Sequence, residues 1–243
     1  MDISLINLDR CTEKLARFHQ FNSHLSAVSR VPAVDGRTLS RAQLIERKIM
    51  AEDIPGYTNG ALGCALSHFA QWERAVREQK TLNIAEDDAV FHRDFERHAP
   101  AILAALPPDW DIILWGWNFD SILFFDLIPG VSPAVATFDQ KNLRASLDKF
   151  QHSPLFPHPY RLYRAFGTVA YSVTPAGAEK LHRHCVPIRP FEVYYPGLNR
   201  SLPNSEVDHM TNDAYPITNA FVCFPPLVVT ENDHAQSATV TNS

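Results

Sequence analysis

The sequence offers little sulfur chemistry and no segment built to cross a membrane. Four cysteines are present among 243 residues, and no two of them form a CxxC pair. Such scattered thiols indicate reduced cysteines rather than a disulfide framework or a cysteine zinc site. No apolar run approaches the roughly 18 residues of a membrane span, and the first residues lack the pattern of a signal peptide. We therefore expect a cytoplasmic protein, with at most a peripheral association at the inner face of a membrane.

Positive charge is also in short supply. The chain has 22 Lys and Arg against 27 Asp and Glu, a formal net charge of −5. General nucleic-acid binding needs a basic surface, so no nucleic-acid partner is expected. An acidic protein can still bind an anion through a bound cation. The length and the 45% apolar content indicate one sizeable domain, and the oligomeric state stays open.

The order of predicted elements indicates an α/β protein. Residues 3–6 and 29–34 have strand character and flank a helical pattern, an arrangement typical of parallel strands in an α/β sheet. Further strands are predicted at 81–85 and 110–115, and residues 163–173 are either a strand pair or one long strand, interrupted at Gly167. Further helices are predicted at 40–48, 61–78, 94–106 and 175–184. The proline-rich and aromatic-rich segment 119–159 has no readable pattern, and we interpret it as an excursion over the site.

Three adjacent acids, Glu86, Asp87 and Asp88, directly follow one of these strands. Their mutual repulsion is unfavourable unless solvent or a cation offsets it. The carboxyl ends of strands form the ligand crevice of an α/β sheet, and carboxylates there suit a hard divalent cation. The alternative is an exposed loop or a cap on the following helix.

The predicted helix at 61–78 begins with a stripe of small and polar residues that includes Gly63 and Ser67, with His68 at its edge. Such a stripe permits close approach of a backbone or a ligand, and a helix start favours anions. His68 could donate a hydrogen bond to a phosphate or a sugar. Tight packing of the helix against the sheet, with a satisfied histidine, is the alternative.

Five short segments carry motifs in a fixed order along the chain. They are Ile6-Asn7-Leu8-Asp9-Arg10, Ala33-Val34-Asp35-Gly36, Gly63-Cys64-Ala65-Leu66-Ser67-His68, Glu86-Asp87-Asp88, and Ala170-Tyr171-Ser172-Val173 with Gly177-Ala178. Together they resemble glycosyltransferase family 25, which includes bacterial lipooligosaccharide galactosyltransferases and collagen galactosyltransferases. The resemblance spans residue 3 to about residue 237, and it is the order of the motifs that is specific.

The resemblance implies a single Rossmann-like nucleotide-diphospho-sugar transferase domain of the A type, with a mixed central sheet flanked by helices. This domain would cover 1–237, followed by a mobile tail at 238–243. The resemblance also implies a divalent metal, most often Mn²⁺, and inverting transfer of galactose from UDP-galactose to a glycan or glycolipid acceptor. The residues implied for the nucleotide sugar are Asn7, Arg10, Asp35, Gly36, Ser67, His68 and Asp87, and those for the metal are Glu86 and Asp88.

An inverting transferase needs a base for the acceptor hydroxyl, and the segment Val207-Asp208-His209-Met210 makes Asp208 the candidate. Asp208 or His209 could instead bind metal or substrate, and His234 could complete the metal shell. The chain departs from the family at Ala61, where glutamate is usual, at Ile84-Ala85, and at Glu206, where proline is usual. These departures bear on the identity of donor and acceptor.

Two rival functions remain at this point. One is a sugar-nucleotide or glycan binding module without catalysis. The other is a metal-dependent phosphohydrolase that uses the same acids, although the sequence shows no separate second metal cluster. Aromatic residues could stack on an acceptor sugar, and Trp117 and Tyr194 are the first to test, but packing in the core is the expected role for most of them.

Overall fold

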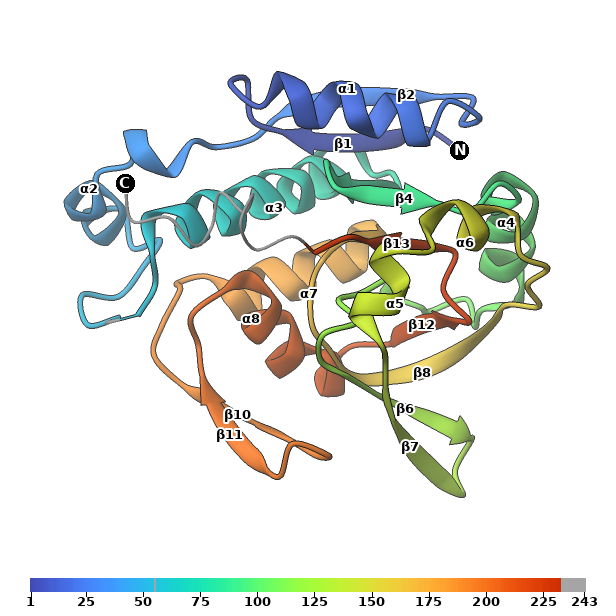
Figure 1. Cartoon of the computed structure of the whole chain (residues 1–243). Helices are drawn as coiled ribbons and strands as arrows, with labels where there is room; N and C mark the ends of the chain where they lie inside the picture. Colours follow the sequence, from blue (N-terminus) through green and yellow to red (C-terminus); the bar gives the residue numbers. More distant parts are fainter. Residues whose placement is uncertain (55, 233–243) are drawn as a thin grey trace.

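A nine-stranded mixed β-sheet forms the centre of the molecule (Figure 1). The computed structural model describes residues 1–54 and 56–232. His234 and the predicted tail at 238–243 lie outside the described residues. The strand order is β2-β1-β3-β9-β5-β12-β8-β6-β7. The strands of this sheet are β1 Ile3–Asn7, β2 Val28–Pro32, β3 Leu82–Glu86, β5 Ile112–Gly116, β6 Ile122–Ile128, β7 Ser132–Thr137, β8 His158–Ala165, β9 Ala170–Val173 and β12 Ala220–Phe224.

The first three strands of the sheet are parallel, as the opening pattern predicted. β1 pairs with β2 on one side and with β3 on the other, both in parallel register. The helix α1 (Thr12–Phe21) makes the crossover from β1 to β2. Parallel strands end at the same edge of a sheet, so Asn7, Pro32 and Glu86 finish close together.

The rest of the sheet is mixed. β9 lies antiparallel between β3 and β5, and β12 is parallel to β5 and antiparallel to β8. The segment predicted at 163–173 is therefore two strands, β8 and β9, which break around Gly167, where φ is +83°. The apolar run near the C-terminus also divides, into β12 and the short β13 (Val228–Thr230), which pairs with β4 (Ala89–Phe91).

The segment 119–159 differs from the expectation. It supplies the hairpin β6–β7 at the far edge of the sheet and the short helices α5 (Gln140–Arg144) and α6 (Leu147–His152). Among the described residues, none of this segment lines the cavity described below. Residues 122–137 of this segment form paired strands that extend the sheet.

Helices cover both faces of the sheet and bury two apolar clusters. The remaining helices are α2 Arg41–Glu46, α3 Asn59–Glu78, α4 Phe95–Ala105, α7 Pro175–Cys185 and α8 Val207–Ala214. On β5, Ile112 and Leu114 join the cluster under α3, α7 and α8, whereas Ile113 and Trp115 join the cluster under α4 and β4. This alternation is the period of two of a strand buried on both faces.

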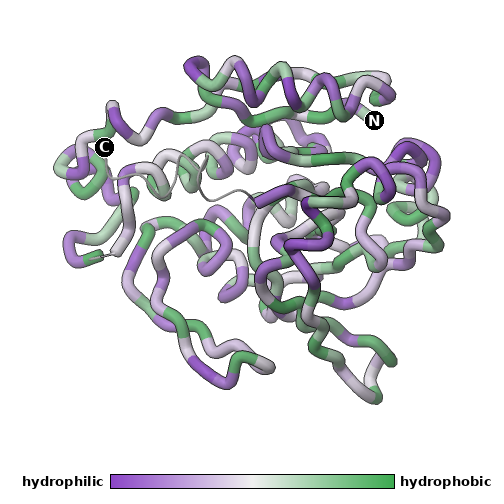
Figure 2. Tube along the Cα trace, in the orientation of Figure 1, coloured by the Kyte–Doolittle hydropathy of each residue, from purple (hydrophilic) through white to green (hydrophobic). Residues whose placement is uncertain are grey.

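Helix boundaries follow the local sequence. Thr174 caps α7 by accepting a hydrogen bond from the Gly177 backbone N–H, and Pro175 occupies the first turn, as predicted. Hydrophilic and hydrophobic residues alternate along α1 in Figure 2, which fits a helix that buries Phe18 and exposes its other side. Among the described residues, no helix is long and apolar enough to cross a membrane.

Candidate active site

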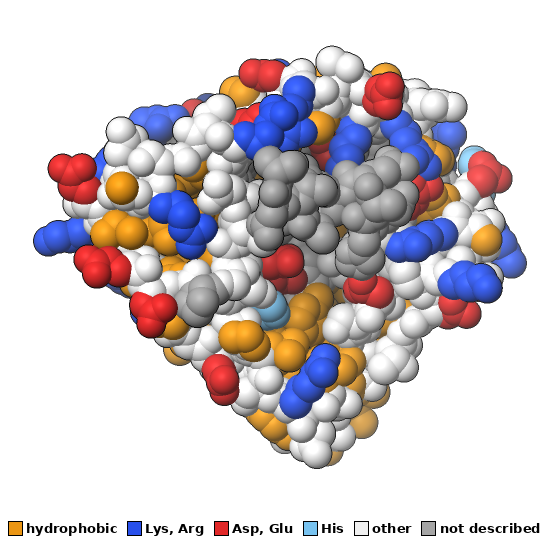
Figure 3. All heavy atoms as spheres, turned by 60° about the vertical axis from the view of Figure 1, so that its left-hand side comes forward, with side chains coloured by type: hydrophobic (Ala, Val, Ile, Leu, Met, Phe, Trp, Pro, Cys, Tyr) orange, Lys and Arg blue, Asp and Glu red, His pale blue; other side chains and the backbone are white. Residues whose placement is uncertain are grey.

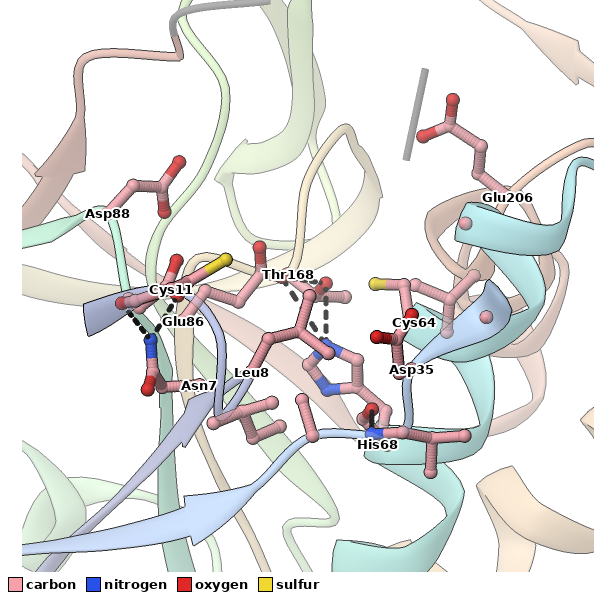
Figure 4. Close-up of a pocket in the computed structure, with 18 of the residues that line it drawn as sticks. Asn7, Leu8, Cys11, Asp35, Cys64, His68, Glu86, Asp88, Thr168 and Glu206 are labelled. Atoms are coloured by element: carbon pink, nitrogen blue, oxygen red, sulfur yellow. Dashed lines mark hydrogen bonds and ion pairs between the residues drawn. The ribbon is translucent and has the colours of Figure 1, made fainter. Parts of the chain in front are cut away.

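A cavity of about 540 Å³ opens where the carboxyl ends of β1, β2 and β3 meet the first turns of α3 and α8 (Figure 4). The residues predicted for the nucleotide sugar, the metal and the base all line it, although they come from segments far apart in the chain. The carboxyl edge of parallel strands is the usual ligand crevice of an α/β sheet. Figure 3 shows acidic and apolar side chains gathered together near the middle of one face of the molecule.

Asp87 is tied to the first strand and the first helix. Its Oδ2 accepts a hydrogen bond from Asn7 Nδ2 at 2.7 Å, and its Oδ1 lies 3.6 Å from Lys14 Nζ. Asn7 Nδ2 also donates to the Cys11 carbonyl, and Arg30 donates to Asn7 Oδ1. Burial raises the pKa of Asp87, with Lys14 and Asn7 opposing the rise. These contacts fix the edge of the cavity, and ligand contact by Asn7 and Asp87 stays a prediction.

Arg10 and Asp35 meet at the rim of the cavity. Arg10 Nε lies 3.1 Å from Asp35 Oδ2, and Arg37 Nη2 lies 2.7 Å from the same oxygen. Hydrogen bonds from Arg37 and then Arg10 hold the pKa of Asp35 well below its usual range. Asp35 therefore stays ionised and orders two guanidinium groups at the entrance.

The start of α3 packs directly on the loop after β2. A Cβ at Gly36 would lie 1.9 Å from the Asn59 carbonyl oxygen, and a Cβ at Gly63 would lie 2.5 Å from the Val34 carbonyl oxygen. Ser67 Oγ accepts a hydrogen bond from the Val34 backbone N–H at 2.8 Å and donates to the Gly63 carbonyl at 2.7 Å. The glycine stripe thus brings the helix N-terminus to the cavity, and the Ser67 hydroxyl is used to hold the loop.

Glu86 and His68 meet at the floor of the cavity. His68 Nε2 lies 3.4 Å from Glu86 Oε1, and the Thr168 hydroxyl donates to the same oxygen at 2.5 Å (Figure 4). Burial opposes ionisation of Glu86, but the contact with His68, the bond from Thr168 and the charge of Lys14 outweigh it and lower the pKa of Glu86. Glu86 is therefore an anion at neutral pH.

Asp88 is the member of the acidic cluster whose charge is least compensated. Its Oδ2 accepts a hydrogen bond from Thr230 Oγ1 at 2.9 Å, but its Oδ1 is buried and has no partner among the described residues. Burial, followed by the charges of Glu86 and Asp87, raises the pKa of Asp88 to about 7. A buried carboxylate with a free oxygen beside two other carboxylates is a position that a cation would stabilise.

Asp208 is held at the first turn of α8, and it is only 6% exposed. Its Oδ2 accepts a hydrogen bond from the Gly167 backbone N–H at 3.0 Å, and its Oδ1 has no partner within the described part of the chain. Glu206 lies over the same side of the cavity. Loss of solvent and the charges of Asp208, Glu86 and Asp120 raise the pKa of Glu206 to about 7.

Two sets of side chains could hold a metal. Ligand atoms of Cys64, His68 and Glu86 all lie within 4.8 Å of one another. This set of sulfur, nitrogen and oxygen donors would suit Zn²⁺, and burial raises the pKa of the Cys64 thiol well above its usual value. The orphaned oxygen of Asp88 fits a hard cation such as Mn²⁺ or Mg²⁺ better, because it adds an oxygen ligand at a carboxylate cluster.

Sequence reasoning missed several residues of the cavity, and some residues that it singled out lie outside the cavity. Cys64, Asn118, Thr168 and Glu206 line it without having been assigned a role. His68 contacts Tyr171, and both residues lie in family motifs, so the motifs were the sequence feature that could have indicated this contact. His209 does not line the cavity and contacts Ser205 through Nδ1. Trp117 is buried in the core, as expected for most of the aromatic residues, and Tyr194 is 51% exposed on β10 (Glu192–Tyr195), away from the cavity lining.

The fold and the cavity together define an α/β protein with an acidic cavity at the carboxyl edge of its parallel strands. Residues 1–195 match the family model described as "Glycosyltransferase family 25 (LPS biosynthesis protein)". Because this match covers most of the chain, the chain belongs to glycosyltransferase family 25. The family resemblance drawn from the motifs is thereby confirmed.

Several curated relatives are similar over about half of this chain. A glycosyltransferase 25 family member of Anopheles gambiae is 36% identical over 127 residues, which are 47% of this chain and 21% of the relative. Procollagen galactosyltransferase 2 of Mus musculus is 32% identical over 129 residues, 47% of this chain and 20% of the relative. The inactive glycosyltransferase 25 family member 3 of Mus musculus is 31% identical over 130 residues, which are 47% of this chain and 22% of the relative.

The matched segment thus spans about a fifth of the length of these curated relatives. A solved structure, of A197 from STIV, aligns over 96% of each chain with 10% sequence identity and a TM-score of 0.36. That similarity is too low to assign a fold.

Proposed function

We propose that this chain is a metal-dependent inverting glycosyltransferase that moves galactose from UDP-galactose to a hydroxyl group of a glycan or glycolipid. The observation that supports it most is that two carboxylates, Asp88 and Asp208, line one cavity and each keep a buried oxygen that has no partner among the described residues. The A-type arrangement of a nucleotide-diphospho-sugar transferase is part of the same proposal.

The donor would lie along the β1–β3 side of the cavity. Asp88 and Glu86 would hold the divalent cation, Mn²⁺ in this proposal, because both carboxylate side chains line the cavity. A bound cation supplies charge stabilisation for the departing diphosphate. Arg10, ordered by Asp35, lies at the rim, and the N-terminus of α3 would add a favourable field for phosphate oxygens.

Asp208 would act as the base. Its Oδ1 would take the proton from the acceptor hydroxyl while the hydroxyl oxygen forms a bond to the anomeric carbon of the donor sugar. The bond between that carbon and the diphosphate oxygen breaks, and its electron pair leaves with UDP. Attack opposite to the leaving group inverts the configuration. The Gly167 backbone N–H, which donates to Asp208 Oδ2, keeps the carboxylate oriented.

A panel of nucleotide sugars in a thermal-shift measurement, with and without Mn²⁺, tests the donor. Ligand that binds only the folded state raises Tm by mass action. UDP-galactose with Mn²⁺ is expected to raise Tm more than other nucleotide sugars and more than UDP-galactose with a chelator. Absence of any shift with every nucleotide sugar would remove the proposed donor class.

A second candidate is a binding module of the same family without turnover. The similarity to a relative whose name describes it as inactive supports this second candidate. It shares the expected thermal shift but predicts no release of UDP. A phosphohydrolase would instead release inorganic phosphate from simple esters and transfer no sugar, so product analysis separates the three.

A further inference from the structure

A line of buried polar contacts runs behind the cavity floor from α3 to β9. Trp72 Nε1 lies 2.9 Å from the Tyr171 hydroxyl oxygen, and the same oxygen lies 2.9 Å from His68 Nδ1. Trp72, Tyr171 and His68 are each at most 1% exposed. These contacts are too deep for a substrate to touch, so their role must be carried through His68.

The chemistry of the three groups fixes the direction of each hydrogen bond. An indole N–H can only donate, so the Tyr171 oxygen accepts from Trp72. The single Tyr171 O–H proton is then directed to His68 Nδ1, which must be the unprotonated nitrogen of the ring. The opposite assignment would leave that hydroxyl proton without an acceptor among the described residues, and an unsatisfied buried donor costs about 1–3 kcal/mol.

The front side of the ring agrees with this assignment. With Nδ1 unprotonated, the ring proton of neutral His68 is on Nε2, which faces Thr168 Oγ1 at 3.3 Å and Glu86 Oε1 at 3.4 Å. The Thr168 hydroxyl gives its own proton to Glu86, so its oxygen is available to accept from His68. Both donors meet Oε1 of Glu86, and the other carboxylate oxygen takes no part in this network.

We infer that Tyr171 is a positioning residue whose hydroxyl, fixed by Trp72, holds His68 with its proton on Nε2 as a donor toward Glu86 and Thr168. His68 is then a hydrogen-bond partner of Glu86 and not a ligand in a Cys64–His68–Glu86 metal site. The consequence for turnover rests on the proposed function, in which Glu86 helps to hold the cation. The tautomer itself does not depend on that function.

Histidine ¹⁵N NMR of the full chain at neutral pH, without metal, tests the tautomer directly. His68 is assigned through the signals lost in His68→Asn. The expected result is a protonated Nε2 and an unprotonated Nδ1. A ring protonated on Nδ1, or on both nitrogens, would overturn the inference.

Variants test the part played by Tyr171. Tyr171→Phe removes the hydroxyl and should leave His68 without its tautomer preference. If Tyr171→Phe does not fold, Trp72→Phe takes its place in the test and should weaken the same preference. Tyr195→Phe is the matched control, because it removes another buried hydroxyl outside this network and should leave His68 unchanged. Identical His68 signals in wild type and in a folded Tyr171→Phe variant would remove Tyr171 from the role.

Metal addition and kinetics complete the test. Zn²⁺ should leave the Nε2 proton in place, and its replacement by the metal would make His68 a ligand and contradict the inference. If the protein transfers sugar, Tyr171→Phe should lower kcat about tenfold, as is usual for groups that orient metal ligands, with a smaller change in donor KM. An inactive wild type would refute the proposed function but would leave the NMR result to decide this inference.

Discussion

Asp88 is the carboxylate of the site whose negative charge is least favourable. It lies beside two other acids, it is deprived of solvent, and one of its oxygens has no partner in the described part of the chain. Its neighbour Glu86 is stabilised as an anion by His68 and Thr168, so the unfavourable charge falls on Asp88. An ionised Asp88 contributes little to the stability of the fold by itself, whereas a bound cation would neutralise its charge.

Cation affinity should therefore depend on pH through Asp88. Its pKa is raised to about 7, so a proton competes with the cation below that pH and is released when the cation binds. The association constant for Mn²⁺ should fall by up to about tenfold for each pH unit below 7 and level off above it. Calorimetric titration with Mn²⁺ at several pH values measures this.

The matched variants are Asp88→Asn, in the cavity, and Asp148→Asn, whose carboxylate is exposed outside it. The first should lose Mn²⁺ binding, and the second should keep both the affinity and its pH dependence. A wild-type affinity that does not change between acid and neutral pH would contradict the role of Asp88.

Asp208 also keeps a buried oxygen that has no partner within the described residues, and its replacement should separate binding from chemistry. In Asp208→Asn the amide oxygen can still accept the bond from the Gly167 N–H, so α8 and donor binding should be retained. Loss of a general base should lower kcat about 10²–10⁴-fold. Asp213→Asn, on the same helix but outside the cavity lining, should transfer normally. Unchanged turnover in Asp208→Asn would exclude it as the base.

At the scale of elements, the site depends on how closely α3 approaches the loop after β2. Gly63→Ala would place a Cβ 2.5 Å from the Val34 carbonyl oxygen and 2.8 Å from the Gly36 backbone nitrogen, and neither atom can move without shifting the loop. We expect a loss of about 1–3 kcal/mol in the free energy of unfolding, with weaker nucleotide-sugar binding because Asp35 and Gly36 shift.

Ala70→Gly is the control for Gly63→Ala, because Ala70 is exposed on the same helix. It should cost about 1 kcal/mol through helix propensity alone and leave binding intact. Chemical denaturation and calorimetry measure the two effects. Wild-type donor affinity in Gly63→Ala would show that the close approach is not needed for the site.

The same scale shows what the sequence could predict and why. The first βαβ unit, α3 and α7 were predictable because their periodicity and caps are local. The position of β9 between β3 and β5 was not, since pairing of distant strands leaves no local pattern. Likewise, the sequence around Asp87 does not distinguish it from Asp88. Asp87 differs because it contacts Lys14 and Asn7, which are distant in the sequence.

At the scale of the whole molecule, the cavity is assembled from segments that lie far apart in the chain. Its wall takes residues from β1, the loop after β2, α3, β3, the turn before β9 and the start of α8. The family motifs located most of these segments, whereas the presence of Thr168 and Glu206 in the same cavity depends on tertiary packing. Figure 4 shows Glu86 and Asp88 on one side of the cavity and Glu206 on another, which is consistent with separate places for donor and acceptor.

The most direct measurement is UDP release from UDP-galactose by the purified chain, with Mn²⁺ and with excess chelator, in wild type and in Asp88→Ala. We predict metal-dependent release of UDP by the wild type, at a rate that an acceptor glycan increases, and loss of that release in chelator and in the variant. Asp148→Asn should behave as the wild type. Full activity in chelator or in Asp88→Ala would contradict the metal site, and a wild type that binds UDP-galactose without releasing UDP would contradict the assignment as a transferase.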